Sequence, residues 1–257
     1  MLKKRLIFNL LHSNGYFMLS RNFTLQQVGD INWLRDNYKF WESSKFLDEI
    51  IILDVSRTDS DFNKFIDTVQ NVVKSSFIPV AVGGGIKKLE DVDQLIRSGA
   101  DKVVINSMFY SNPDEIKKIT SKYGIQAVIA SIDYKRNKNF DKVYINNGSK
   151  KIEIDLIEYI KRVIDTGVGE ILLNSMDQDG TGQGFDLDVI NRIGDIKNTS
   201  LIISGGAGRI DHFSEALALD YDAASTANLF NFIGDGLRRS REDLIAKKIN
   251  IPVFDRD

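Results

Sequence analysis

Short runs of apolar residues alternate along the whole chain with longer segments of helical periodicity. The apolar runs are rich in Val, Ile and Leu and are nearly continuous, which is typical of strands buried on both faces of a parallel sheet. Eight strands are predicted, near Arg5–Leu11, Glu49–Asp54, Pro79–Val82, Lys102–Asn106, Gln126–Asp133, Glu170–Asn174, Ser200–Ser204 and Asp222–Thr226. The helical pattern predicts helices that include Asp61–Ser75, Leu89–Arg97, Pro113–Lys122, Ile152–Thr166 and Leu187–Ile193.

This alternation without any linker favours a closed (β/α)8 barrel over an open, doubly wound sheet. The chain has 257 residues, close to the usual length of about 250 for one such barrel, so we expect a single domain. One interruption, Tyr134–Gly148, is polar and contains the alternating run Val143-Tyr144-Ile145. It predicts a hairpin inserted after the fifth strand.

An internal repeat indicates how the barrel is built. The segment Ile78–Gly85 resembles Leu201–Gly208, and a similar strand follows each of the two segments. We therefore interpret the chain as a TIM barrel made of two half-barrels, about 1–122 and 123–257, related by duplication.

Each half carries a glycine cluster between a buried strand and a helix, Gly83–Gly85 in the first and Gly205–Gly208 in the second. Without side chains, backbone N–H groups can approach an anion, and a helix N-terminus adds favourable dipole charge. One cluster alone could be only a tight turn, but two at matched positions favour two phosphate groups on one rim. The predicted phosphate-binding residues are Gly84, Gly85, Asn106, Ser107, Gly180, Gly205, Gly206, Ala227 and Asn228.

Composition excludes several classes of function. Hydrophobic residues make up 42% and charged residues 27%, as in an ordinary soluble globular protein, and the net charge of −2 gives no electrostatic case for nucleic acid or membrane binding. The absence of cysteine excludes disulfides, cysteine nucleophiles and thiolate metal sites. The segment Asp177–Gly180 lacks the later glutamate of a calcium loop. We expect no metal, no cofactor and a cytoplasmic location.

Ordered motifs along essentially the whole chain match one family. The clearest are Val82–Ile86, Gly99–Val103, Ile132–Arg136, Gly169–Leu173, Ser175–Thr181 and Ser204–Gly208. The chain resembles the cyclase subunit of imidazole glycerol phosphate synthase, a histidine-biosynthesis barrel. The sister isomerase of that pathway shares the double barrel, but the Asp-Gly-Thr segment and the Gly-Glu-Ile-Leu-Leu run are similar to the cyclase.

The resemblance implies a partner and a route for ammonia. In that family a glutaminase subunit docks against the N-terminal face of the barrel as a heterodimer, and ammonia passes through the barrel to a phosphorylated small-molecule substrate. In that family four charged residues close the mouth of the barrel at the N-terminal face. Asp101 falls at a position where the family's barrel contacts the glutaminase. The matching gate positions here are Arg5, Glu49, Lys102 and Glu170. Their joint match favours an ammonia entrance over four ordinary surface charges.

The catalytic end departs from the family pattern. Of the family's two catalytic aspartates, the second is present as Asp133, whereas the first falls at Leu11, which cannot transfer a proton. The lysine of the following loop falls at Leu19. Other polar candidates at the rim are Asp54, Asp179 and Thr181. We expect an intact ammonia entrance and impaired cyclase chemistry.

These observations favour a divergent cyclase-like subunit of a glutamine amidotransferase complex, a lyase-type synthase. It would modify a phosphorylated substrate or pass ammonia to a third, amidating enzyme, as in the amidination of sugars in surface polysaccharides. One alternative is a genuine cyclase of histidine biosynthesis in which Asp54 or Asp179 replaces the lost carboxylate. Another is a non-catalytic scaffold that activates the glutaminase and conducts ammonia. The final ammonia acceptor stays open.

Overall fold

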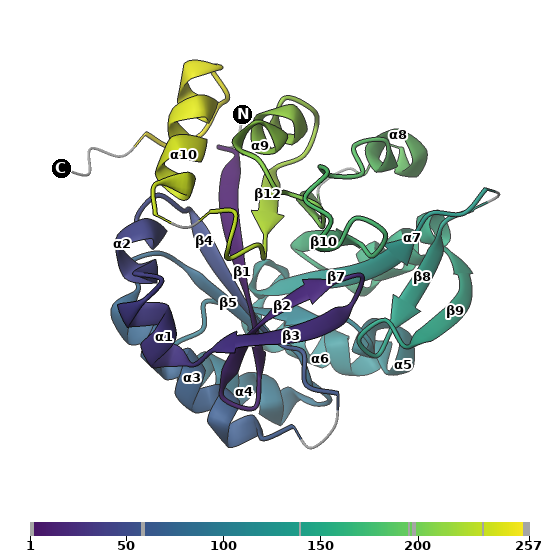
Figure 1. Cartoon of the computed structure of the whole chain (residues 1–257). Helices are drawn as coiled ribbons and strands as arrows, with labels where there is room; N and C mark the ends of the chain where they lie inside the picture. The colour runs from purple at the N-terminus through teal and green to yellow at the C-terminus, as the bar shows by residue number, and fades with distance from the viewer. Residues whose placement is uncertain are drawn as a thin grey trace.

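Eight parallel strands close into a barrel in the computed structural model, which describes residues 3–57, 60–138, 140–194, 196, 199–232 and 234–253 (Figure 1). In chain order the barrel strands are β1 (Arg5–Ser13), β4 (Glu49–Asp54), β5 (Val80–Gly83), β6 (Lys102–Ile105), β7 (Val128–Lys135), β10 (Glu170–Ser175), β11 (Ser200–Ser204) and β12 (Ala223–Thr226). Neighbouring strands pair in parallel, and the β12–β1 and β7–β10 pairings complete the circle. The predicted TIM barrel is confirmed.

Helices cover the outside of the barrel. The longer ones are α3 (Phe62–Ser75), α4 (Leu89–Arg97), α6 (Pro113–Tyr123), α7 (Leu156–Thr166), α9 (Ile210–Leu217) and α10 (Gly236–Ala246). The shorter ones are α1 (Ile31–Asp36), α2 (Phe40–Ser44), α5 (Met108–Ser111), α8 (Val189–Ile193) and the 3-10 turn η1 (Ile125–Ala127). α3 shows why these segments are helical: Asp61 caps its first N–H groups, and Phe65, Val69 and Val72 recur on its buried face.

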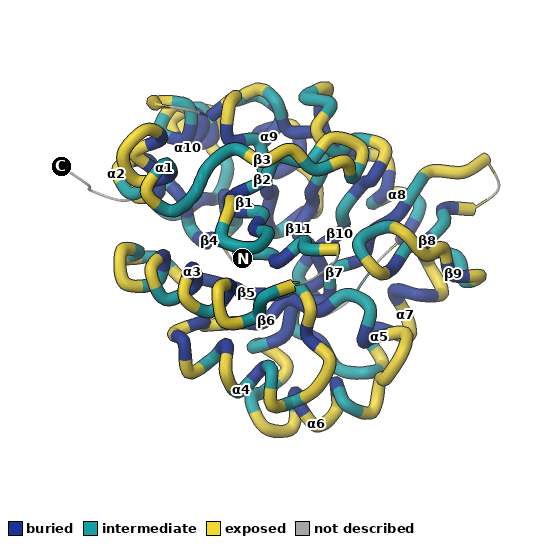
Figure 2. The backbone as a smooth tube through the Cα atoms, turned by 60° about the horizontal axis from the view of Figure 1, so that its bottom comes forward, coloured by how far each residue is buried: buried dark blue, intermediate teal, exposed yellow. Residues whose placement is uncertain are grey.

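The lumen is layered because side chains alternate along each strand. Every barrel strand contributes one buried residue to an apolar layer, made of Ile7, Ile51, Ala81, Val104, Ile129, Leu172, Ile202 and Ala223. Two residues earlier along four strands come the charged side chains of the predicted gate. Two residues later come mostly polar or small side chains: Asn9, Leu53, Gly83, Asn106, Ser131, Asn174, Ser204 and Ser225. Figure 2 shows the buried strands inside and the exposed helix surfaces outside.

The hairpin predicted after the fifth strand is present but longer than expected. It consists of β8 (Lys142–Ile145) and β9 (Lys150–Asp155), and Asn139 within the segment lies outside the described residues. The helix predicted from Ile152 is wrong at its start, because β9 pairs with β8 as far as Asp155. Asp155 then caps α7 by accepting the Glu158 N–H at 3.0 Å. Likewise Gln126 lies in a 3-10 turn rather than in a strand.

A second hairpin, absent from the sequence prediction, crosses the C-terminal end of the barrel. It is formed by β2 (Tyr16–Arg21) and β3 (Thr24–Gly29), and β2 pairs antiparallel with the end of β1 (Figure 1). Asn14 and Gly15 join β1 to β2 with positive φ angles of 50° and 95°, as a two-residue type I′ turn requires. Within the part of the chain that the structure describes, no helix is long and apolar enough to span a membrane.

Candidate functional site

A cavity of about 1440 Å³ opens at the C-terminal end of the barrel. Its walls are the ends of the barrel strands, and both hairpins contribute to its lining. Most of the predicted rim residues line it: Asp54, Gly84, Gly85, Asn106, Ser107, Asp133, Asp179, Gly180, Gly205, Gly206, Ala227 and Asn228. Thr181 is outside this lining, and its hydroxyl donates to the Gln178 carbonyl at 2.9 Å. The strand ends therefore gather almost all predicted rim positions around one space.

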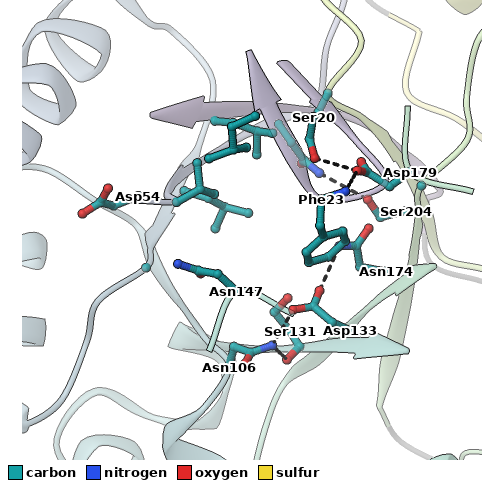
Figure 3. A pocket seen from close by; sticks show the side chains of 18 of the residues that line it. Ser20, Phe23, Asp54, Asn106, Ser131, Asp133, Asn147, Asn174, Asp179 and Ser204 are labelled. Carbon is teal, nitrogen blue, oxygen red and sulfur yellow. Dashed lines mark hydrogen bonds between the residues drawn. The ribbon is translucent and has the colours of Figure 1, made fainter. Parts of the chain in front are cut away.

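Asp133 is the carboxylate turned towards the middle of this cavity (Figure 3). It is 7% exposed and accepts hydrogen bonds from the amides of Asn174 at 2.8 Å and Asn106 at 3.1 Å. Burial raises the pKa of Asp133 to about 6, the charge of Asp179 adds to the rise, and the two amide hydrogen bonds oppose it. A carboxyl group with such a pKa can both accept and release a proton near neutral pH.

Asp54 is turned away from the cavity centre (Figure 3). Its oxygens accept hydrogen bonds from the hydroxyls of Ser56 and Ser60, each at 2.6 Å, and from the Ser56 N–H at 3.1 Å. Burial opposes ionisation of this carboxyl, but the His12 ring 3.9 Å away and the hydrogen bonds from Ser56 and Ser60 outweigh it and lower the pKa of Asp54. Its carboxylate therefore organises the loop after β4.

Asp179 fastens the β2–β3 hairpin over the cavity. Its carboxylate accepts hydrogen bonds from the Ser20 hydroxyl at 2.6 Å and the Phe23 N–H at 2.8 Å. Burial raises the pKa of Asp179. A Cβ atom on the next residue, Gly180, would lie 2.2 Å from the Ser20 carbonyl oxygen, so glycine is needed for the hairpin to approach this closely.

Contacts between three segments form a roof over the cavity, and the sequence analysis did not predict these contacts. Phe23, at the tip of the β2–β3 hairpin, packs so closely on Gly148 that a Cβ there would lie 2.6 Å from its ring. The Arg57 guanidinium donates to the Phe23 carbonyl. The Asn147 amide donates to the Ser56 carbonyl at 3.2 Å. The ends of both hairpins and the loop after β4 thus hold one another in place above Asp133.

The glycine clusters border the cavity with backbone in the left-handed region. Gly85 and Gly206 have φ angles of 70° and 103°. Within the described ranges, neither N–H group has a hydrogen-bond acceptor. A Cβ on Gly206 would lie 2.0 Å from the Gly184 carbonyl oxygen, whereas a Cβ on Gly85 would meet nothing within 4 Å. By contrast, the Asn228 N–H is already donated to the Thr226 hydroxyl at 3.1 Å.

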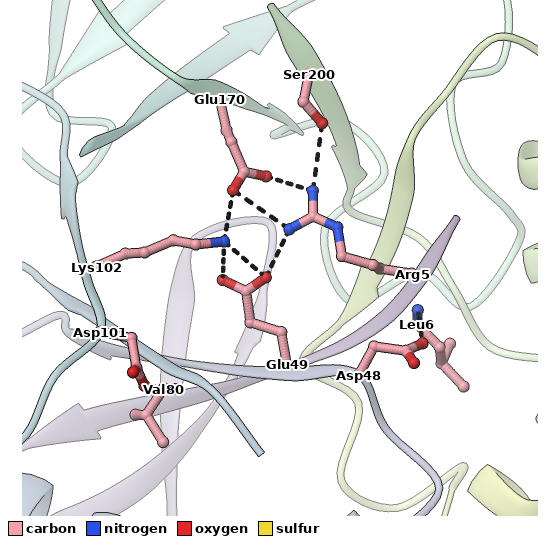
Figure 4. Close-up of polar contacts among 9 residues, drawn as sticks. All are labelled: Arg5, Leu6, Asp48, Glu49, Val80, Asp101, Lys102, Glu170 and Ser200. Atoms are coloured by element: carbon pink, nitrogen blue, oxygen red, sulfur yellow. Dashed lines mark hydrogen bonds and ion pairs between the residues drawn. The ribbon is translucent and has the colours of Figure 1, made fainter. Parts of the chain in front are cut away.

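At the opposite mouth, the four predicted gate residues form a ring of ion pairs (Figure 4). Arg5 contacts Glu49 at 2.7 Å and also pairs with Glu170, and Lys102 contacts Glu49 at 3.0 Å and also pairs with Glu170. Burial raises the pKa of Glu49. For Glu170 the hydrogen bonds and charges of the two cations outweigh burial and lower its pKa.

Asp101 lies beside this ring, immediately before β6, and is exposed to solvent (Figure 4). Its carboxylate accepts the Val80 N–H at 2.8 Å, so it also fixes the start of β5. Among the described residues, no group of three or more His, Cys, Asp or Glu side chains is arranged to hold a metal ion.

The sequence matches the histidine biosynthesis protein family over residues 34–234. The chain belongs to this family. It is 46% identical over 243 residues to a Parasynechococcus marenigrum protein that carries the name imidazole glycerol phosphate synthase subunit hisF2, covering 94% of this chain and 90% of that protein. It is 37% identical over 254 residues to the Pyrococcus furiosus imidazole glycerol phosphate synthase subunit HisF, covering 98% and 99%. The Pyrobaculum aerophilum subunit HisF is 42% identical over 208 residues, 81% of each chain.

In this member of the histidine biosynthesis family, an apolar wall stands at the β1–β4 side of the cavity. Leu11 is paired with Leu53 on the neighbouring strand, and both line the cavity together with Leu19 of β2. None of these side chains can exchange a proton. Asp54 is bonded within the loop after β4 and Asp179 is bonded to the β2–β3 hairpin, whereas Asp133 is turned towards the middle of the cavity (Figure 3).

Proposed function

We propose that this chain is the ammonia-receiving synthase subunit of a glutamine amidotransferase complex related to imidazole glycerol phosphate synthase, with altered chemistry at its C-terminal face. The observation that carries the proposal is the arrangement of the lumen. A ring of paired charges lies at one mouth, an apolar layer follows, and a polar cavity into which the Asp133 carboxyl is turned lies at the other. An uncharged molecule as small as ammonia suits such a path, because the apolar layer strongly disfavours ions.

The N-terminal face supports docking of a glutaminase. Phe77 is fully exposed in the loop before β5, Ile125 is 52% exposed before β7, and Leu219 is 40% exposed before β12. Exposed apolar side chains with charged neighbours such as Asp101 are typical of protein–protein contacts. Three relatives carry names that describe subunits of a larger enzyme, which is consistent with a partner for this chain.

The docking face is tested by binding of the glutaminase subunit. Phe77→Ser should weaken the complex at least tenfold, whereas Ile157→Ser, on the outer surface of α7, should leave it unchanged. Asp101→Asn removes the negative charge and keeps the hydrogen bond, because the amide oxygen can still accept the Val80 N–H. If Phe77→Ser has no effect while cavity variants abolish association, the partner binds the other face.

A phosphorylated small molecule is the substrate class that the cavity favours. The unpartnered N–H groups of Gly85 and Gly206 lie on the two glycine loops, and the cavity between them can accommodate a ligand with a phosphate at each end. Asp133 would exchange a proton with the part of the ligand between the two phosphates. Leu11 and Leu53 would contact the same ligand without proton transfer, which is the reason we propose that the chemistry differs from cyclisation.

The second candidate is a genuine cyclase of histidine biosynthesis, which the names of the relatives favour. The isolated barrel, supplied with an ammonium salt and the histidine-pathway substrate, separates the two. We expect negligible turnover, because the loss of one acid–base group typically costs about 100- to 10,000-fold. Robust turnover would mean a genuine cyclase. A third case, a scaffold that only conducts ammonia, predicts that Asp133→Asn leaves the activity of the whole complex unchanged.

A further inference from the structure

Asn9 lies at the bottom of the cavity, on the side of the lumen that faces the gate. Along β1, Arg5 belongs to the gate, Ile7 to the apolar layer, and Asn9 comes next, 4% exposed. Its amide nitrogen donates to the hydroxyls of Ser225 at 3.2 Å and Ser204 at 3.4 Å. Its oxygen, Oδ1, is buried and has no hydrogen-bond partner among the described residues.

A buried acceptor without a partner destabilises a protein, so it calls for an explanation beyond folding. A leucine of similar size would suit a lumen whose adjoining layer is apolar. The neighbouring hydroxyls differ from each other. Ser225 donates its proton to the Ile203 carbonyl at 3.3 Å, whereas the Ser204 hydroxyl finds no acceptor in the described part of the chain. Side by side, therefore, lie an unused acceptor on Asn9 and an unused donor on Ser204.

We propose that Asn9 Oδ1 and the Ser204 hydroxyl form a binding station for one molecule of neutral ammonia at the point where it leaves the apolar layer. Ammonia has three N–H donors and one lone pair, so it can donate to Oδ1 while it accepts from Ser204. The inference rests on the proposed passage of ammonia through the barrel. No bond is made or broken at the station, and ammonia continues unchanged towards Asp133.

The chemistry of the amide fits a neutral ligand better than an ion. A carboxamide oxygen carries no net charge and is too weak a base to take a proton, so it can hold ammonia without trapping ammonium. A carboxylate at the same place would bind ammonium strongly in this buried setting. The apolar layer beneath, from Ile7 to Ala223, also disfavours any charged form on the path.

The experiment follows the side-chain amide signals of Asn9 and the backbone amides of Ser204 and Ser225 by NMR of the full chain during titration with ammonium chloride. At about pH 9 a large share of the ammonium is neutral ammonia, and at about pH 6 almost none is. We expect saturable shifts at the higher pH only, with no response to matched sodium chloride. The exposed side-chain amides of Asn63 and Asn71 report any general effect of salt or pH.

Two variants sharpen the test. Asn9→Leu should abolish the saturable shift of Ser204 and should leave the unfolding midpoint unchanged or higher, since an unpartnered acceptor is removed. In Asn9→Asp the saturable shifts should instead appear at the lower pH, where the ligand is the ammonium ion. A missing response in the unmodified chain, an unaltered Ser204 shift in Asn9→Leu, or a lower unfolding midpoint in that variant would each overturn the station. If the chain binds its glutaminase but shows no response here, only the station fails and the proposed function stands.

Discussion

The N-terminal mouth of the barrel holds four charged side chains that neutralise one another, whereas in the cavity at the other end the buried carboxyl of Asp133 is bonded only to neutral amides. In the ring, Arg5 and Lys102 each contact both glutamates, so the buried charge is largely compensated. Above it, Asp133 has only the amides of Asn106 and Asn174, and its pKa rises to about 6. Opposite charges stabilise the ionised groups at the N-terminal mouth. Asp133 has no cation beside it to stabilise its charge, so it can exchange a proton near neutral pH.

The largest effect is expected from restoring chemistry to the upper end. Leu11→Asp alone should recover little cyclisation of the histidine-pathway substrate, because Leu19 still leaves the substrate loosely held. The double variant Leu11→Asp/Leu19→Lys should recover more than the two single changes combined, by up to about 100- to 10,000-fold over the unmodified chain, since both groups act on one bound state. Steady-state turnover with saturating ammonium salt measures this. Equal activity in the unmodified chain and the double variant would contradict the role assigned to Leu11.

The next effect concerns stability at the lower mouth. Glu170→Gln should lower the free energy of unfolding by about 2 to 3 kcal/mol at neutral pH, because it leaves the two cations sharing one carboxylate. Since the pKa of Glu170 is lowered, its contribution is present above its ordinary pKa and is lost as pH falls through the folded value. Urea unfolding at neutral and acidic pH measures both.

Two comparisons control that result. Glu49→Gln should cost less than Glu170→Gln, because burial already raises the pKa of Glu49 and opposes its ionisation. Asp114→Asn breaks an exposed pair with Lys117 on α6 and should change stability far less than Glu170→Gln, because solvent screens the pair. If Glu170→Gln destabilises the fold as little as Asp114→Asn does, the four charges of the ring do not stabilise one another.

The third prediction uses the raised pKa of Asp133. The folded carboxyl titrates at about 6, above its ordinary 3.8, so its ionisation destabilises the fold. That penalty is absent below the ordinary pKa, grows as pH rises, and is complete above about pH 6. Relative to Asp133→Asn, the unmodified chain should lose about 1 to 3 kcal/mol of stability between acidic and weakly alkaline pH. Urea unfolding of both proteins across this range measures the difference. A difference that does not change with pH would show that Asp133 titrates normally.

Periodicity and glycine positions predict the barrel well, because eight buried strands and their helices each carry a local signal. The β2–β3 hairpin was missed although Asn14-Gly15, a strong hairpin signal, stands in the sequence. The end of β9 was assigned to a helix because Ile152 and Leu156 are four residues apart, as on one helix face, while Ile152 and Ile154 also alternate as in a strand. Short apolar runs are ambiguous until pairing with a neighbouring strand decides between the two.

The candidate site, like the fold, could be predicted from the sequence only in part. The family resemblance indicated Asp133 and the gate, because the gate residues fall at the starts of four predicted strands and Asp133 falls at the end of the fifth. The roof formed by Phe23, Arg57 and Asn147 could not be predicted, since its contacts join loops that lie far apart in the sequence. Asn9 was also missed, because only the structure shows that its oxygen lacks a partner.

The half-barrel duplication stays a proposal, and equivalent contacts support it. Asp101 accepts the Val80 N–H at 2.8 Å, and Asp222 accepts the Leu201 N–H at 2.8 Å, each across 21 residues of sequence. If the two halves are equivalent, Asp101→Ala and Asp222→Ala should destabilise the barrel by similar amounts, about 1 kcal/mol each.

The last prediction distinguishes an anion site from a plain turn at the cavity end of the barrel. Gly85→Asn should weaken binding of inorganic pyrophosphate about tenfold, because its side chain would occupy the open space beside the unpartnered N–H group. Asparagine tolerates the φ of 70°, so the fold should be kept. Gly206 is less suitable, since any Cβ there collides with the Gly184 carbonyl and shifts the loop. Gly15→Asn, at another open position with positive φ outside the cavity lining, is the matched control. Calorimetric titration that shows identical affinity for both variants and the unmodified chain would reduce the first glycine cluster to a turn between β5 and α4.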